Sequence, residues 1–128
     1  MGGQTVEVGA RRLLIVDDDT EVCAVIGDIA EEQGYQVTAT HTGAEFMARY
    51  PQSRPHRIVL DLALPDHDGM ELLKFLADRK CAADIILISS HGKLMLDQAM
   101  KLGDIHGLNR HRMLPKPFSP DDLKAALA

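Results

Sequence analysis

The sequence predicts an α/β domain in which helices cover both faces of a parallel, five-stranded sheet. From Arg12 onward, short apolar runs alternate with segments of helical period, a pattern typical of consecutive βα units. Three of the runs are continuously apolar, as expected for parallel strands buried on both faces. The chain has 128 residues, of which 45% are hydrophobic and 26% charged, which suits one globular domain.

The first half of the chain contains two predicted βα units. Leu13–Val16 is the first strand, and the helix after it ends at Gly34, a residue suited to a left-handed stop. Gln36–Thr40 is the second strand, and a short helix over Ala44–Tyr50 ends before Pro51. The first helix carries apolar residues at helical spacing, namely Val22, Val25, Ile26, Ile29 and Ala30.

Two further units follow. The strand Ile58–Leu60 precedes a helix over Met70–Arg79, and the strand Asp84–Ile88 precedes a helix over Leu94–Leu102 that ends at Gly103. Apolar residues on one face of these two helices are expected to point inward, namely Leu72, Leu73, Leu76, Leu96, Ala99 and Met100.

The last unit pairs the strand Arg112–Leu114 with a helix that reaches Ala128. Ser119 and Pro120 are a strong helix start, because a capping hydroxyl is followed by proline at the first helical position. A helix of this length buries little surface, so we expect it to be truncated and a further C-terminal domain to follow. Residues 1–10 carry no periodic apolar pattern and are expected to form a flexible tail ahead of a domain over 11–128.

Composition excludes several classes of function. The net charge of −5 argues against direct contact with nucleic acid, which requires clustered Lys and Arg. No apolar run approaches the about 20 residues of a membrane span, and the N-terminus lacks the regions of a secretory signal, so we expect a cytoplasmic protein without membrane contact. Cys23 and Cys81 lack any zinc-site spacing and are interpreted as reduced structural thiols.

Acidic residues, a serine and a lysine follow the predicted strands at the points where these end. They are Asp17, Asp18, Asp61, Ser89 and Lys116. In an open parallel sheet, ligands bind beyond the carboxyl ends of the strands, so these side chains are expected to converge. Carboxylates in one crevice repel each other unless a cation or protons intervene, and oxygen ligands with retained water favour Mg²⁺.

Each of these residues also has an ordinary structural interpretation. The Asp triplet at 17–19 can cap a helix, which is the interpretation we favour for Asp19, and Ser89 can be a turn residue. Asp61 is different, because an acid that ends a buried strand is costly to desolvate, which favours a polar crevice around it. A carboxylate beside Mg²⁺ can act as a nucleophile toward phosphorus, and Lys116 would supply the cation that neutralises the transferring oxygens.

Four motifs in this order resemble the receiver domain of two-component response regulators. They are VDDD at 16–19, DLALPDHDG at 61–69, ISSHG at 88–92 and LPKPF at 114–118. The resemblance covers residues 12–127 and implies a flavodoxin-like, doubly wound sheet of the CheY type, with strand order 2-1-3-4-5. It implies a signalling switch, not an enzyme, that takes a phosphoryl group from a sensor histidine kinase, a phosphotransfer protein or a small phosphodonor.

The resemblance also implies residue roles around the metal. Asp61 matches the phosphoacceptor, Asp17 and Asp18 match the acidic pair that holds Mg²⁺, and the backbone carbonyl of Ala63 matches a further metal ligand.

A second group of residues matches positions that respond to phosphorylation. Ser89 matches the switch hydroxyl, and Lys116 matches the lysine that pairs with the phosphoryl group. Met113 stands where many receivers have an aromatic switch residue, and the bond before Pro117 matches one that is cis in the family.

The resemblance has consequences for partners as well. It implies dimerisation through the face formed by the fourth helix, fifth strand and fifth helix. The GLN…LPKPF run at 107–118 is similar to receivers that precede EAL-type cyclic di-GMP phosphodiesterases, which makes such an output domain a partner hypothesis.

The sequence leaves two alternatives open. A phosphohydrolase of the haloacid dehalogenase kind favours a second Asp two residues after its nucleophile, where this chain has Ala63. A degenerate receiver that serves only as an interaction module would not need the complete set of acidic residues and lysine.

Overall fold

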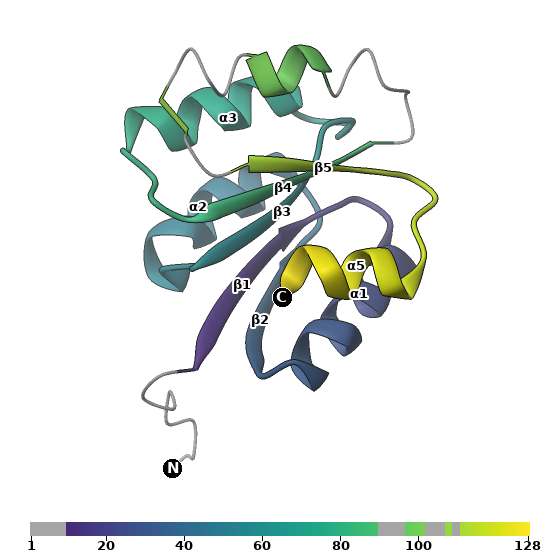
Figure 1. Cartoon of the computed structure of the whole chain (residues 1–128). Coiled ribbons are helices and arrows are strands. Elements are labelled where there is room, and N and C mark those ends of the chain that lie inside the picture. Colours follow the sequence, from purple (N-terminus) through teal and green to yellow (C-terminus); the bar gives the residue numbers. More distant parts are fainter. Residues whose placement is uncertain (1–9, 90–96, 102–106, 109–110) are drawn as a thin grey trace.

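The computed structural model describes residues 10–89, 97–101, 107–108 and 111–128, and it shows a parallel sheet flanked by helices (Figure 1). The strands are β1 (Arg11–Val16), β2 (Tyr35–Thr40), β3 (Arg57–Asp61), β4 (Asp84–Ser89) and β5 (His111–Pro115). The named helices are α1 (Thr20–Glu32), α2 (Gly43–Ser53), α3 (Gly69–Asp78) and α5 (Pro120–Leu127). Residues 97–101 are also helical. The strand order is β2-β1-β3-β4-β5 with all neighbours parallel, so the predicted fold class is confirmed.

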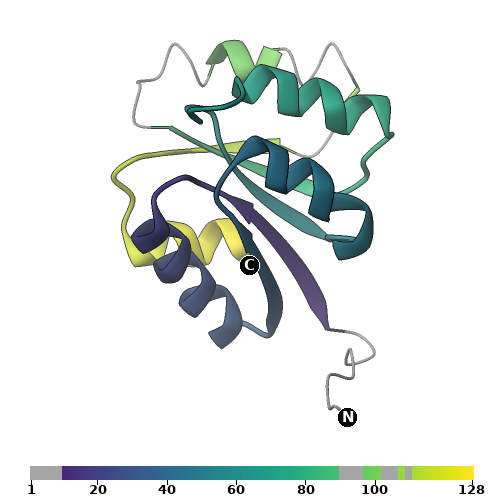
Figure 2. The same cartoon turned by 180° about the vertical axis from the view of Figure 1, so that it is seen from behind.

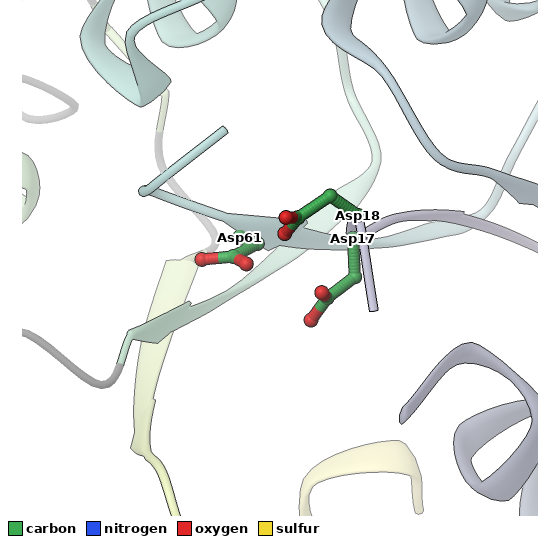
Figure 3. Close-up of side chains that lie close together, drawn as sticks. All are labelled: Asp17, Asp18 and Asp61. Carbon is green, nitrogen blue, oxygen red and sulfur yellow. The ribbon is translucent and has the colours of Figure 1, made fainter. Parts of the chain in front are cut away.

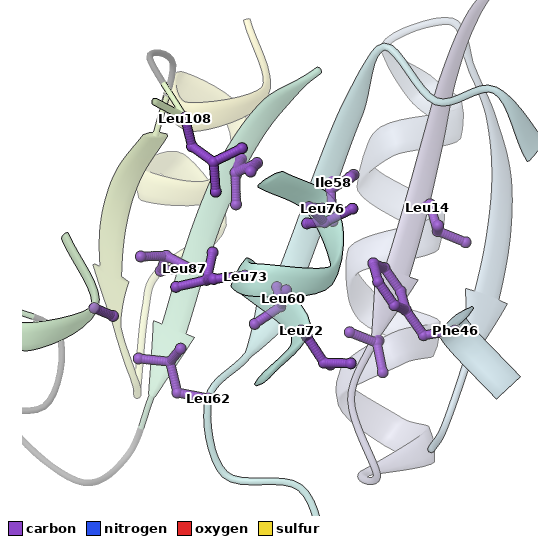
Figure 4. Close-up of a cluster of buried hydrophobic side chains, with 13 residues drawn as sticks. Leu14, Phe46, Ile58, Leu60, Leu62, Leu72, Leu73, Leu76, Leu87 and Leu108 are labelled. Carbon is purple, nitrogen blue, oxygen red and sulfur yellow. The ribbon is translucent and has the colours of Figure 1, made fainter. Parts of the chain in front are cut away.

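The sheet separates two apolar cores, and the alternation of side chains along each strand supplies both of them. In β1, Leu13 and Ile15 pack under α1 and α5, whereas Leu14 and Val16 pack under α2 and α3. Figure 2 shows α2 and α3 on one face, and Figure 4 shows the leucine-rich core beneath them. The continuous apolar runs in the sequence are therefore strands that are buried on both faces.

The predicted end of the second helix was wrong. The helix continues past Tyr50 to Ser53 and includes Pro51. Proline removes one N–H donor, but this loss falls in the last turn, where the hydroxyl of Ser53 donates to the carbonyl of Tyr50 at 3.0 Å. The helix stops at Arg54, whose left-handed φ of 43° serves as its C-cap.

The first helix was predicted more accurately, apart from one residue. Asp19 is its N-cap, and Gly34 has a φ of 92° just beyond its end, as the sequence indicated. Val22, Ile26, Ile29 and Ala30 pack against the core beneath α1. Val25, however, is 50% exposed, because it points away from both cores. Helical spacing alone cannot tell an inward from an outward valine at the margin of an apolar stripe.

The fourth predicted helix is tested in part. Ala99 is buried in the core beside α3, and Met100 packs against that core, as expected. Leu94, Leu96, Leu102 and Gly103 lie outside the described residues, as do residues 1–9 of the predicted tail. Within the described part of the chain, no helix has the length and apolar character that a bilayer crossing requires.

The short helix α5 is held at its C-terminal end by side chains from the first residues of β1, β2 and β3. The buried guanidinium of Arg57 donates to the carbonyl of Ala126 at 2.7 Å, and the Tyr35 hydroxyl and Arg11 donate to Leu127 at 2.6 and 3.0 Å. These carbonyls lack partners within the helix, and their dipoles favour a cation. The eight-residue helix, which buries Leu123, Ala126 and Leu127, is thereby also fixed by hydrogen bonds to the first three strands.

Two glycines should respond in opposite ways to replacement by alanine. At Gly69, a Cβ would lie 2.6 Å from the backbone of Leu62, whereas at Gly27 the nearest atom is 3.7 Å away. Gly69→Ala should therefore destabilise the fold by about 1–3 kcal/mol through overpacking. Gly27→Ala should be neutral or stabilising by up to about 1 kcal/mol, because alanine lowers the backbone entropy of the unfolded chain. Urea unfolding measures both, and a Gly69→Ala protein as stable as wild type would contradict the packing at this position.

Candidate functional site

Three carboxylates gather at the carboxyl edge of the sheet (Figure 3). Asp17 and Asp18 follow β1, and Asp61 ends β3, which pairs directly with β1 through Val16 and Leu60. One oxygen from each carboxylate lies within 4.8 Å of the others. The parallel register thus brings together residues that are more than forty positions apart in the sequence, as the strand-end pattern predicted.

The carboxylates differ in their exposure to solvent. Asp17 is fully buried and Asp61 is 3% exposed, whereas Asp18 is exposed at the rim. Burial of ionised groups is costly unless charge or hydrogen bonds compensate it. The two inner acids therefore depend on the groups around them.

Lys116 supplies part of this compensation. Its Nζ lies 2.7 Å from Asp17 Oδ2 and 3.3 Å from Asp61 Oδ2. The lysine follows β5, and its backbone N–H donates to the carbonyl of Ser89 at 2.9 Å, which places it at the same edge of the sheet.

The charges in this crevice affect one another. Burial raises the pKa of Asp61, and the charge of Asp17 adds to this effect, while the N–H of Ala63 and the ammonium of Lys116 oppose it. Burial acts to lower the pKa of Lys116, but its ion pairs with Asp17 and Asp61 outweigh burial, so that this pKa is raised. The lysine therefore stays charged.

The residues of the crevice fit a metal ion. Three ionised carboxylates and one ammonium leave two negative charges uncompensated. Asp17 Oδ1 accepts the N–H of Asp19 at 2.9 Å, but the buried Oδ2 has no hydrogen bond in good geometry within the described residues, although Lys116 lies near it. An all-oxygen donor set with this charge suits a hard divalent cation.

The other predicted site residues lie around the cluster. Ser89 is buried at the end of β4, opposite Pro115 of β5. The backbone N–H of Ala63 donates to Asp61 Oδ1 at 3.0 Å. The Lys116–Pro117 peptide bond is cis. Met113 is 36% exposed on the edge strand β5, two strands away from Asp61 in β3.

Sequence reasoning missed two residues that hold Asp17 in place. The Cys23 thiol donates to the carbonyl of Asp17 at 3.3 Å, and the N–H of Asp17 donates to the carbonyl of Thr40 at 3.2 Å. Burial, together with the charge of Asp17, raises the pKa of Cys23 to about 11, so the thiol remains a protonated donor. Both cysteines are free, in agreement with the prediction. In the sequence, Cys23 is only a cysteine in the first turn of an apolar helix, and this pattern does not indicate a contact with Asp17.

An apolar groove adjoins the crevice. Its walls come from α1 and from the segment between β5 and α5, namely Val22, Val25, Pro117 and Phe118, with Asp19, Glu21 and Lys116 at its polar margin. The exposed Val25 is thus part of a hollow beside the lysine that contacts Asp61.

Comparison with known proteins agrees with this arrangement. A sequence profile described as "Response regulator receiver domain" matches residues 13–128. The alkaline phosphatase synthesis transcriptional regulatory protein PhoP of Bacillus subtilis is 29% identical over 115 residues, which cover 90% of this chain and 46% of PhoP. The chain thus spans about half the length of that relative.

Solved structures share the fold. A CheY-like response regulator receiver domain from Methanospirillum hungatei superposes with a TM-score of 0.79 at 28% identity, with 93% of this chain and 91% of that chain covered. The beryllofluoride-activated NtrC4 receiver domain dimer has a TM-score of 0.78 at 28% identity, with 91% and 92% covered. Because the profile match spans nearly all of the described fold, this chain belongs to the response regulator receiver domain family.

Proposed function

We propose that this domain accepts a phosphoryl group on Asp61 in a Mg²⁺-dependent reaction and passes the change to an output. The observation that supports the proposal best is the convergence of Asp17, Asp18 and Asp61 with Lys116 in one buried crevice. Membership of the receiver family supports a sensor histidine kinase or a phosphotransfer protein as the donor, with small phosphodonors as substitutes.

In this proposal Asp17, Asp18, Asp61 and the carbonyl of Ala63 hold Mg²⁺. The ion would supply charge neutralisation for the transferring phosphoryl oxygens. A carboxylate oxygen of Asp61 forms a bond to phosphorus while the donor's bond to phosphorus breaks, which yields an acyl phosphate. The Ala63 N–H orients Oδ1 of Asp61, and Lys116, beside Oδ2, offsets the negative charge of the new group.

The response to phosphorylation would begin at Ser89. Its position at the end of β4, one strand from Asp61, suits a hydroxyl that turns toward the phosphoryl group. The added charge would then bias a two-state surface near the fourth helix and β5, where Met113 is exposed. That surface, with α5, is the proposed dimer face.

The apolar groove beside Lys116 is the proposed approach of the phosphodonor. A protein donor has to bring its phosphohistidine to Asp61, and the groove lined by Val25 and Phe118 offers apolar contact directly beside that path.

An output domain completes the proposal. The GLN…LPKPF run supports an EAL-type cyclic di-GMP phosphodiesterase as that output. The reading frame of the gene beyond Ala128 tests this directly, since an EAL-type sequence is expected there and a stop codon would overturn it.

Labelling by a small phosphodonor tests Asp61 as the phosphoacceptor. Incubation with acetyl phosphate and Mg²⁺ should raise the intact mass by one phosphoryl group, and Asp61→Asn should abolish the increase, because an amide is not a competent nucleophile. Asp78→Asn, which alters an exposed carboxylate at the far end of α3, is the control and should still be labelled. Persistent labelling of Asp61→Asn would overturn the site assignment. Multiple turnover of simple phosphoesters would instead favour the phosphohydrolase.

Magnesium should stabilise the domain through the same carboxylates. At ten times its Kd, Mg²⁺ should raise the free energy of unfolding by about 1.4 kcal/mol in the wild type. Thermal unfolding with and without Mg²⁺ measures this, and Asp61→Asn should respond much less. The same stabilisation in Asp17→Asn/Asp61→Asn would place the ion elsewhere, and no stabilisation of the wild type would favour the degenerate receiver.

Without Mg²⁺, Asp61→Asn should itself be more stable than wild type at pH 7. The pKa of Asp61 is raised in the folded state, so its favourable contribution exists below its ordinary pKa and is lost as the pH rises through the raised value. Asparagine cannot ionise, so Asp61→Asn does not lose this stability. The gap in the free energy of unfolding between the two proteins should therefore shrink toward acidic pH. A gap that widens on acidification would contradict the sign of the shift.

The groove can be tested separately from the chemistry. Val25→Asp should slow phosphotransfer from a histidine kinase that phosphorylates the wild type, because a charge enters the apolar contact. Labelling by acetyl phosphate should be unchanged. Asp28→Ala, a change at another exposed position of α1, is the matched control. Unaltered transfer from the kinase to Val25→Asp would exclude the groove as the docking place.

A further inference from the structure

The loop between β3 and α3 is closed at its neck. Ala63 and Asp68 form an antiparallel bridge, and the N–H of Gly69 donates to the carbonyl of Leu62 at 3.2 Å. Asp68 also caps α3 through a capping box with Glu71. Ala63, whose N–H contacts the phosphoacceptor, thus belongs to a compact six-residue loop with a defined base.

The tip of this loop is fastened to a different element. Asp66 Oδ1 accepts the N–H of Gly43 at 2.8 Å, and Oδ2 accepts the N–H of Ala44 at 3.0 Å. These donors form the first turn of α2, where backbone N–H groups lack partners within the helix. The two hydrogen bonds lower the pKa of Asp66, so its carboxylate is charged at neutral pH.

A second contact supports the same junction. A Cβ on Gly43 would lie 2.7 Å from the Cβ of His67, so the loop and α2 approach as closely as glycine permits. His67 in turn lies 3.4 Å from Glu71 of α3. Asp66 therefore does more than form a local turn, because its partners are more than twenty residues earlier in the chain.

We propose that Asp66 is a positioning residue for the metal site. By joining the loop tip to the start of α2, it fixes the loop whose base presents the Ala63 N–H to Asp61 and, under the proposed function on which this inference rests, the Ala63 carbonyl to Mg²⁺. A loop fastened at both base and tip holds Ala63 in one position before the ion arrives, and such outer contacts commonly set metal affinity.

Calorimetric titration of Mg²⁺ into the full chain tests this positioning role. Asp66→Ala should weaken Mg²⁺ binding by about threefold to tenfold. This loss is smaller than is usual for outer contacts of a metal site, because Asp66 is remote from the ion. Asp66→Asn should recover part of the affinity, because its amide oxygen still accepts one N–H. Asp78→Ala, which removes an exposed carboxylate from the far end of α3, should bind like wild type. All titrations are done well below each variant's unfolding temperature.

A double-mutant cycle identifies the junction itself. Gly43→Ala displaces His67 and should also weaken Mg²⁺ binding, and in the double variant with Asp66→Ala the two losses should not add, because both act through one contact. Wild-type affinity in Asp66→Ala, an equal loss in Asp78→Ala, or additive losses would overturn the positioning role. A wild-type protein that binds no Mg²⁺ would instead contradict the proposed function, and this inference with it.

Discussion

Repulsion among the carboxylates at one edge of the sheet is the constraint on which the rest of the structure depends. Asp17 and Asp61 are nearly excluded from water, and one lysine cannot neutralise them together with Asp18. The arrangement survives because the sheet beneath it is rigid and buried on both faces, with β1 and β3 paired along their length. The free energy of packing in the two cores keeps this unfavourable charge cluster together, and a divalent cation would relieve the repulsion.

The order of the sheet explains why the cluster forms where it does. β1 and β3 are neighbours, so their last residues lie side by side, and β4 and β5 bring Ser89 and Lys116 to the same edge. Contacts below the site are as important as those within it. The Cys23 thiol and the carbonyl of Thr40 fix the backbone of Asp17, which leaves its side chain little freedom. The fold itself therefore holds the carboxylates and Lys116 close together.

The elements of the fold were predictable because strands buried on both faces leave continuous apolar runs, as in Leu13–Val16 and Ile85–Ile88. The predictions from sequence were wrong where the surrounding structure decides how a helix ends or which way a side chain points. Pro51 normally ends a helix, but near the C-terminus its cost is small and Ser53 completes the turn. Val25 fits the apolar period of α1 but borders a groove. The strand order rested on the family resemblance, since local patterns do not contain pairing partners.

The candidate site likewise contains residues that the sequence indicated and residues that only the fold reveals. Asp61 and Lys116 stood out because charged residues at the ends of buried strands need an explanation. Asp66 stands shortly before Asp68 and Gly69, a pattern typical of a turn, and only the fold reveals that its carboxylate accepts the first two N–H groups of α2. Contacts between distant segments through backbone groups leave no trace in residue type, which is why the supporting residues could not be found from the sequence.

The central claim is that Asp61 presents its carboxylate to phosphorus beside a cation held by Asp17 and Asp18. A crystal structure of the protein with Mg²⁺ and beryllofluoride tests it most directly. The account predicts beryllofluoride on a carboxylate oxygen of Asp61, one metal ion bound by the three aspartates, and Lys116 in contact with a fluorine. Beryllofluoride or the ion bound away from Asp61, or Lys116 turned out of the crevice, would contradict it.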